Sequence, residues 1–190
     1  MRKLISFMHI SLDGFVAGPN REMNWITVDE EIFDHVGRRI SQTDTALYGR
    51  TTYQMMENYW PTAADKPNAS RHDREHAAWY NKAHKIVLSN TLKKEELANK
   101  TIIGDKLSDR ILAIKQQPGT EILVFGSPTA THSLMQLSLI DGYWLFVNPI
   151  ILGRGIPLFK DTREKIKLNL LTTRQFSSGV TELSYMVDSL

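Results

Sequence analysis

The chain alternates between short apolar runs and longer segments in which apolar residues recur at helical spacing. Short runs rich in Ile, Leu, Val and Phe, bounded by turn residues, predict buried strands, whereas apolar residues three or four positions apart predict amphipathic helices. The predicted strands lie at 4–10, 45–48, 84–89, 101–103, 122–125 and 142–152. The predicted helices lie at 29–40, 51–58, 71–82, 106–117 and from the end of the 122–125 strand to 139. Residues 16–20 and 60–70 are predicted as loops.

Two alternating runs close the sequence, at 167–176 and 180–187, and they flank Ser177-Ser178-Gly179. This arrangement predicts a β-hairpin. Strands that alternate with helices predict an α/β fold, in which a mainly parallel central sheet carries helices on both faces. The terminal hairpin adds antiparallel strands. Without a linker or repeat along the sequence, residues 1–190 are expected to form a single domain.

Glycine turns follow several of the predicted strands, at Gly14, Gly49, Gly126 and Gly153. In open α/β sheets, ligands bind beyond the carboxyl ends of the strands. The glycine turns therefore mark the edge of the sheet where a binding site is expected.

The clearest of these turns is Gly126-Ser127-Pro128-Thr129, which joins an apolar strand to a helical pattern. Ser127 or Thr129 can cap the helix, and Pro128 suits its first turn. A helix that starts beside the end of a strand points free N–H groups and a positive dipole end into the crevice. Such a site favours anions, and phosphate above all.

A second strand–glycine–helix junction contains Gly49, Arg50, Thr51 and Thr52. Arginine's planar fork suits phosphate, and the two hydroxyls add hydrogen-bond donors. The alternative is an ordinary helix start with a solvated arginine. Two junctions of this type in one short chain indicate a dinucleotide held by its phosphates, and hence a nicotinamide-dependent reductase.

Small polar residues follow the 84–89 strand, at Ser89-Asn90-Thr91. They are placed to hold the adenosine 2′-phosphate that distinguishes NADPH from NADH, with Lys93 and Lys94 as nearby cations. The alternative interpretation is a plain polar turn.

Composition narrows the choice of partner. Among 190 residues, 42% are hydrophobic and 23% charged, and the net charge is +2. Because the basic residues are scattered, no nucleic-acid partner is expected. The apolar stretch 122–140 is broken by turn and polar residues, so neither a membrane span nor a signal peptide is predicted. The absence of cysteine excludes disulfides and thiolate chemistry and suits a cytoplasmic protein.

The histidines give weak signals. His72 and His76 are four residues apart on a predicted helix, a spacing that can hold zinc, but no third ligand is evident and no metal is expected. His9 and His132 lie on strand and helix patterns, where packing is the default interpretation. Hydride transfer needs no nucleophile from the protein, because the cofactor carries the chemistry.

Two further motifs suit the substrate end of the crevice. Asp13, in the turn that begins at Ser11, is the candidate catalytic residue, either orienting the substrate or relaying a proton. An Asp-Gly turn that merely ends the strand is the alternative. Arg154 lies in a glycine loop that shapes the substrate end or simply ends the preceding strand.

These motifs together resemble a known superfamily. Gly49-Arg50-Thr51-Thr52-Tyr53 is similar to the turn with which dihydrofolate reductases hold cofactor phosphates. Other motifs resemble the reductase domain of bacterial bifunctional riboflavin-biosynthesis deaminase-reductases, in matching order along nearly the whole chain. They are Ser11-Leu12-Asp13-Gly14, Trp25-Ile26-Thr27, Phe125-Gly126-Ser127-Pro128-Thr129 and Asn148-Pro149-Ile150-Ile151-Leu152-Gly153-Arg154-Gly155.

The resemblance implies a dihydrofolate reductase-like three-layer fold and an NADPH cofactor. The riboflavin enzyme reduces the ribosyl group of a phosphorylated aminopyrimidine, so the implied activity is hydride transfer to an imine or carbonyl carbon of a small heterocycle. Carried over by position, the implied cofactor-binding residues are Gly49, Arg50, Thr51, Thr52, Ser89, Gly126, Ser127, Pro128 and Thr129. The implied substrate-binding residues are Ser11, Trp25, Thr27 and Arg154.

This chain departs from the riboflavin reductases at two positions. Phe15 stands where a basic residue usually follows the glycine, and Ile32 stands near an expected arginine, although His35 and Arg38 keep a His-x-x-Arg spacing. With no deaminase domain, the chain is expected to be a stand-alone relative with a different substrate.

Two alternative functions stay open. One is dihydrofolate reduction, which needs a carboxylate at the pterin, for which Asp29, Glu30 and Asp34 are candidates. The other is a nucleotide-binding module without turnover. A homodimer is also expected, with the 143–152 strand and the terminal hairpin pairing or packing between subunits. The alternative is that both segments are buried in one sheet.

Overall fold

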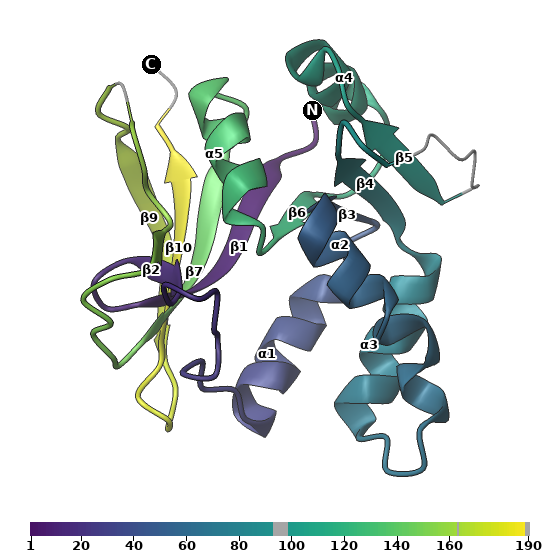
Figure 1. The fold of residues 1–190 in the computed structure, drawn as a ribbon, viewed down its shortest axis with the longest axis vertical. Coiled ribbons are helices and arrows are strands. Elements are labelled where there is room, and N and C mark those ends of the chain that lie inside the picture. Colours follow the sequence, from purple (N-terminus) through teal and green to yellow (C-terminus); the bar gives the residue numbers. More distant parts are fainter. Residues whose placement is uncertain (93–98, 163, 189–190) are drawn as a thin grey trace.

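The computed structural model describes residues 1–92, 99–162 and 164–188. In this part of the chain, eight strands form one twisted sheet, and a short two-stranded ribbon lies beside it (Figure 1). From one edge to the other, the sheet contains β5 (Lys100–Ile103), β4 (His84–Leu88), β3 (Thr45–Gly49), β6 (Ile122–Phe125), β1 (Leu4–Ser11), β7 (Gly142–Asn148), β10 (Thr181–Val187) and β9 (Leu168–Gln175).

The first six strands in this order pair in parallel. β10 runs antiparallel to β7, and β9 runs antiparallel to β10, which closes the sheet with the predicted hairpin. The α/β architecture inferred from the sequence is therefore confirmed.

Helices cover both faces of the sheet. Buried residues of α1 (Glu30–Ile40), α2 (Arg50–Glu57) and α3 (Arg71–Lys82) pack on one face, where Tyr48 and Trp144 point. Buried residues of α4 (Leu107–Gln116) and α5 (Pro128–Gln136) pack on the other face, with Leu47 and Val124. The two sets alternate along each strand, as the pleat requires.

This division follows from chain direction. From β1 through β3 and β4 to β5 the chain moves toward one edge, whereas from β5 through β6 to β7 it moves back. Right-handed crossovers in opposite directions place their helices on opposite faces. The neighbouring strands β3 and β6 thus send their helices, α2 and α5, to opposite sides. Between them lies the topological switch point, where ligands bind in such folds.

Several predicted elements need correction. Residues 60–70 are not all loop, because Trp60–Asp65 forms a short 3₁₀ helix, η1, with Pro61 in its first turn. The predicted 142–152 strand ends at Asn148, since Pro149 has no N–H to continue the ladder. The helix predicted to reach 139 ends at Gln136, where Ser138 adopts a left-handed conformation (φ 53°) and stops it.

The predicted 16–20 loop contains part of a strand that the sequence pattern missed. β2 (Phe15–Ala17) pairs antiparallel with β8 (Ile156–Pro157). The ribbon ties the turn after β1 to the loop after β7. Such pairing joins segments about 140 residues apart, so local pattern does not reveal it. No helix in the described ranges is long and apolar enough to cross a bilayer.

Candidate active site

A cavity of about 900 Å³ opens at the switch point, beyond the carboxyl ends of β3, β4 and β6 and beside β1. Its walls come from the starts of α2 and α5, the ends of β4 and β5, and the segment after β1. All nine residues predicted to bind the cofactor line this one cavity, although they come from three separate stretches of sequence. They are Gly49, Arg50, Thr51, Thr52, Ser89, Gly126, Ser127, Pro128 and Thr129.

The turn between β6 and α5 has an unusual backbone. Gly126 and Ser127 both have positive φ, 54° and 62°, so the chain reverses sharply and brings the start of α5 beside the end of β3. Glycine adopts this conformation freely, whereas serine does so at a cost. Residues held in this conformation are frequent at ligand-binding turns, so the Gly126–Ser127 turn is a candidate ligand contact.

Ser127 corrects one detail of the prediction. Its side chain makes no capping bond to α5. Instead, its Oγ accepts a hydrogen bond of 2.8 Å from the backbone N–H of Gly49, at the start of α2. The first N–H groups of α5 therefore lack a side-chain cap and stay available to a ligand.

Gly49 is required by this contact. A Cβ added at this position would collide with the Oγ of Ser127. The two strand–helix junctions therefore pack directly against each other, 78 residues apart in sequence. Their helix N-termini open into the same cavity, and neither first turn carries an acidic residue. Both features favour an anion in the cavity.

Arg50 extends this anion-favouring region toward β4. Its Nη1 donates a hydrogen bond of 2.6 Å to the Oγ1 of Thr91. The Oγ of Ser89 accepts hydrogen bonds from the N–H groups of Thr91 and Leu92, so the polar turn is folded around it. The predicted cations Lys93 and Lys94 lie outside the described residues.

The charge of the cavity wall is one-sided. Its described lining contains two guanidinium groups, Arg21 and Arg50, and no aspartate or glutamate. Much of the remaining surface is apolar, including Phe7, Met23 and Ile156. A cavity with these walls suits a ligand that combines phosphates with planar or apolar rings.

Asp13 lies outside the cavity wall, in the turn after β1. Its carboxylate accepts hydrogen bonds from the Ser11 hydroxyl (2.6 Å) and from the N–H groups of Leu152 (3.1 Å) and Gly153 (2.7 Å). These bonds, that of Ser11 foremost, lower the pKa of Asp13. They are the contacts of a residue that holds the 152–153 loop. A catalytic role for Asp13 stays a prediction.

The other predicted substrate residues also lie off the cavity wall. Trp25 donates from its indole N–H to the Glu22 carbonyl at 3.2 Å, and Arg154 is exposed. The N–H of Thr27 donates to the Oδ1 of Asn148 at 2.8 Å. Buried Asn148 thereby anchors the segment that precedes α1 to the end of β7.

Sequence analysis missed several lining residues from the segment after β1 and its neighbours. They are Arg21, Met23 and Ile26, together with Ile156 from β8, whereas Asn90, predicted as part of the Ser89-Asn90-Thr91 turn, lines the cavity as expected. Their positions depend on the β2–β8 ribbon and on Asn148, and no local motif marks them. His9, for which packing was the default interpretation, also lines the cavity.

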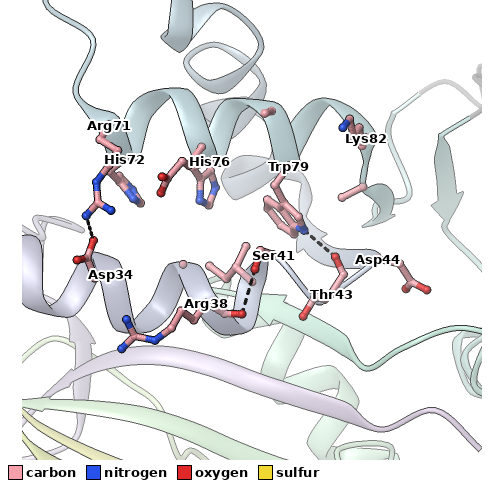
Figure 2. A pocket seen from close by; sticks show the side chains of 15 residues that line it. Asp34, Arg38, Ser41, Thr43, Asp44, Arg71, His72, His76, Trp79 and Lys82 are labelled. Atoms are coloured by element: carbon pink, nitrogen blue, oxygen red, sulfur yellow. Dashed lines mark hydrogen bonds and ion pairs between the residues drawn. The ribbon is translucent and has the colours of Figure 1, made fainter.

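A second cavity, of about 740 Å³, lies between α1 and α3. Several of the polar groups that line it are bonded to one another (Figure 2). Arg71 pairs with Asp34 across the gap between the helices. The indole N–H of Trp79 donates to the Thr43 carbonyl at 2.6 Å, and the Ser41 hydroxyl donates to the Arg38 carbonyl at 3.0 Å.

His72 and His76 point into this second cavity from α3 (Figure 2). The ring of His72 stacks on Phe33 at 3.9 Å, and that of His76 lies 4.0 Å from Trp60. Burial lowers the pKa of His76 to about 3 and also lowers that of His72. The described residues contain no cluster of three groups that could hold a metal ion, so the pair has no third ligand there.

Comparison with known proteins agrees with this architecture. The uncharacterized protein YyaP of Bacillus subtilis (strain 168) is 32% identical over 188 residues, which cover 97% of this chain and 94% of YyaP. A crystal structure of a candidate riboflavin biosynthesis protein from Shewanella sp. PV-4 has a TM-score of 0.73 at 21% identity, covering 98% of this chain and 99% of that one.

A third match is the diaminohydroxyphosphoribosylaminopyrimidine deaminase/5-amino-6-(5-phosphoribosylamino)uracil reductase of Thermotoga maritima. Its TM-score is 0.67 at 15% identity, with 98% of this chain covered but 57% of that one. The shared fold is dihydrofolate reductase-like, as the motifs predicted. Because residues 2–181 match the RibD C-terminal domain, the chain belongs to that family, the reductase-domain family that its motifs resembled.

Proposed function

We propose that this protein is an NADPH-dependent reductase that transfers a hydride to an imine or carbonyl carbon of a small heterocyclic substrate. One observation carries the proposal. Two helix N-termini on opposite sides of the switch point are joined by the Gly49–Ser127 hydrogen bond and open into one cavity without a described carboxylate. This arrangement supports binding of a dinucleotide through its phosphates.

The residues suit the cofactor along its length. The N-termini of α2 and α5 would bind the phosphates, with Arg50 as the counter-charge. The Ser89–Thr91 turn, bonded to Arg50, would favour the 2′-phosphate of NADPH over the free hydroxyl of NADH. When bound, NADPH supplies the hydride. The chain's own residues orient the cofactor and shield it from water.

The substrate is the less constrained part of the proposal. The Thermotoga relative is named for a phosphorylated aminouracil, and a planar ring of that kind would fit between Met23, Ile26 and Ile156. Phe15 in place of a basic residue argues for a substrate with less negative charge than a sugar phosphate.

Reduction of dihydrofolate finds less support in the described structure. Asp29 uses its carboxylate to cap α1, accepting from the N–H of Ile32 at 2.9 Å. Asp34 pairs with Arg71 in the second cavity, and Glu30 lines neither cavity. None of these three carboxylates reaches the switch-point cavity. A nucleotide-binding module without turnover would show cofactor binding but no reduction.

We also propose a cytoplasmic homodimer that pairs through β9. In the sheet, β7 has neighbours on both sides, so it offers no free edge to a second copy. β9 is the free edge beyond β10, and Leu170 and Leu171 are both more than half exposed. An unguarded edge of this kind pairs readily with a second copy. Light scattering should give a dimer mass for the wild type and a monomer mass for Leu171→Lys.

The activity is tested by following NADPH oxidation with the phosphoribosyl aminouracil and with dihydrofolate as parallel substrates. Turnover of the pyrimidine, or of a related carbonyl or imine heterocycle, supports the proposal. Turnover of dihydrofolate blocked by an antifolate would replace it with the alternative activity. NADPH binding without reduction of any heterocycle tested would indicate the module without turnover.

A further inference from the structure

His9 is the candidate that the rest of the structure leaves unexplained. It lies on β1, two residues beyond the point where pairing with β6 ends at Phe7 and Phe125. There the chain turns away through Gly126, so no strand covers that side of β1. The imidazole stacks on Phe146 with ring centroids 5.0 Å apart and forms part of the cavity wall.

The His9 ring is incompletely satisfied. In the described part of the chain, five residues have a buried side-chain polar atom without a hydrogen-bond partner, and His9, through Nδ1, is the one that lines the switch-point cavity. Leaving such an atom unpaired costs about 1–3 kcal/mol. A phenylalanine would keep the ring contacts with Phe7 and Phe146 without this cost. The imidazole is therefore expected to serve something other than packing.

Burial also sets the charge of the His9 ring. Removal from water lowers the pKa of His9 to about 4, so the ring is neutral at pH 7. A neutral imidazole carries one N–H donor and one nitrogen acceptor. It can form a hydrogen bond with a polar atom of an uncharged ring and needs no carboxylate partner to remain in the cavity.

Position completes the argument, which rests on the proposed function. With the cofactor phosphates at α2 and α5 and its adenosine near Ser89, the reacting end of the cavity is the β1 side. The lining contributed by β1 and the segment that follows β2 includes His9, Met23 and Ile26, together with Arg21. Apolar side chains contact the faces of a ring, but they cannot distinguish the polar groups on its edge.

We propose that His9 is the substrate-recognition residue of this cavity, forming a hydrogen bond with a ring carbonyl or ring nitrogen of a planar heterocycle. A group of this kind discriminates strongly, because a ligand that lacks the matching polar atom leaves the buried imidazole unpaired. The ligand class is a flat heterocycle with at least one carbonyl acceptor or ring N–H, neutral at the edge that meets His9.

The test uses the full chain saturated with NADP⁺, which cannot donate a hydride, and uracil, hypoxanthine and pterin as probes. Binding is measured by calorimetry, and the histidine side chains are followed by ¹⁵N NMR. The variants are His9→Phe and His9→Asn, with His72→Phe as the matched control, because His72 also stacks on a phenylalanine but faces the second cavity.

We expect at least one probe to bind the complex and to shift the His9 ring signals while those of His72 stay in place. His9→Phe should weaken that probe about tenfold or more, and His9→Asn should retain most of the affinity. His9→Phe should melt at the same temperature as the wild type or higher, because phenylalanine keeps the ring contacts and removes the unpaired Nδ1, so its weaker binding cannot be put down to lost stability. If His9→Phe folds poorly, the Asn variant and the NMR shifts decide.

Failure of the proposed function and failure of the proposed role of His9 would give different results. If NADP⁺ does not bind the wild type, the proposed function fails, and this inference falls with it. If NADP⁺ binds but no probe shifts the His9 signals, or His9→Phe binds the probe as tightly as the wild type, the role of His9 alone is overturned.

Discussion

The two cavities differ less in size than in what their polar groups are doing. Between α1 and α3, several of the charged and hydrogen-bonding groups already have partners, as in the Arg71–Asp34 pair and the Trp79–Thr43 bond. At the switch point, the first turns of α2 and α5 have no side-chain cap, and the Nδ1 of His9 has no hydrogen-bond partner in the described structure. The bond that joins the two junctions, from Gly49 to Ser127, shapes the cavity wall.

This difference separates a packing defect from a binding site. A polar group that already has a partner gains little from a ligand, whereas an open donor in a cavity gains a charge-assisted bond. The charged residues that line the two cavities also distinguish them. The α1–α3 cavity mixes acids and bases, while the described wall of the switch-point cavity has cations and no carboxylate.

The largest effect is expected from Gly49→Val. The new side chain would displace Ser127 and separate the two helix N-termini, so NADPH affinity should fall about a hundredfold or more. The control is Gly37→Ala in α1, which lines the other cavity, and its added Cβ meets nothing within 4 Å. Titration of NADPH by protein fluorescence measures both. Equal NADPH affinity in the wild type and in Gly49→Val would show that the two strand–helix junctions do not form the cofactor site.

A smaller effect is expected from Arg50→Ala. Loss of one charge-assisted contact to phosphate should weaken NADPH about tenfold, or about 1.4 kcal/mol, and NADH less. Arg71→Ala removes an arginine from the second cavity and should leave NADPH affinity unchanged. The same titration compares them. A larger loss with Arg71→Ala than with Arg50→Ala would reverse the assignment of the two cavities.

The smallest effect concerns acid stability and the second cavity. Because His76 stays neutral in the folded protein down to about pH 3, the unfolded chain binds a proton from about pH 6.5 downward that the folded chain does not. Stability therefore falls as pH drops from 6.5 toward 3. His76→Phe should lose less stability than the wild type between pH 7 and pH 5.5, by about 1 kcal/mol. Urea unfolding at both pH values checks this, and parallel losses would contradict it.

Local signals made much of this molecule predictable. Helix α3 has the predicted bounds, and its start is set by Ser70, which forms a capping box with Asp73. The glycine junctions at Gly49 and Gly126 could also be predicted, because a strand, a turn and a helix start each have a signal within a few consecutive residues. Family resemblance then added the fold and the cofactor that such junctions suit.

The features that could not be predicted from the sequence depend on contacts between distant segments. The Oγ of Ser127 bonds to Gly49 rather than to its own helix, which local capping rules cannot anticipate. The β2–β8 ribbon and the wall that contains Arg21 form only when the turn after β1 meets the loop after β7. His9 was interpreted as a packing residue because the strand pattern around it is apolar. Its exposure to the cavity comes from the early end of β6.

The most direct test of the account is the melting temperature of the purified protein with NADPH, with NADH and without nucleotide. At about a hundred times its dissociation constant, a bound ligand adds about 2.7 kcal/mol, which corresponds to roughly 5–10 °C for a chain of this size. The account predicts such a rise with NADPH and a smaller one with NADH. No rise with either nucleotide would mean that the two junctions shape the fold without binding a cofactor.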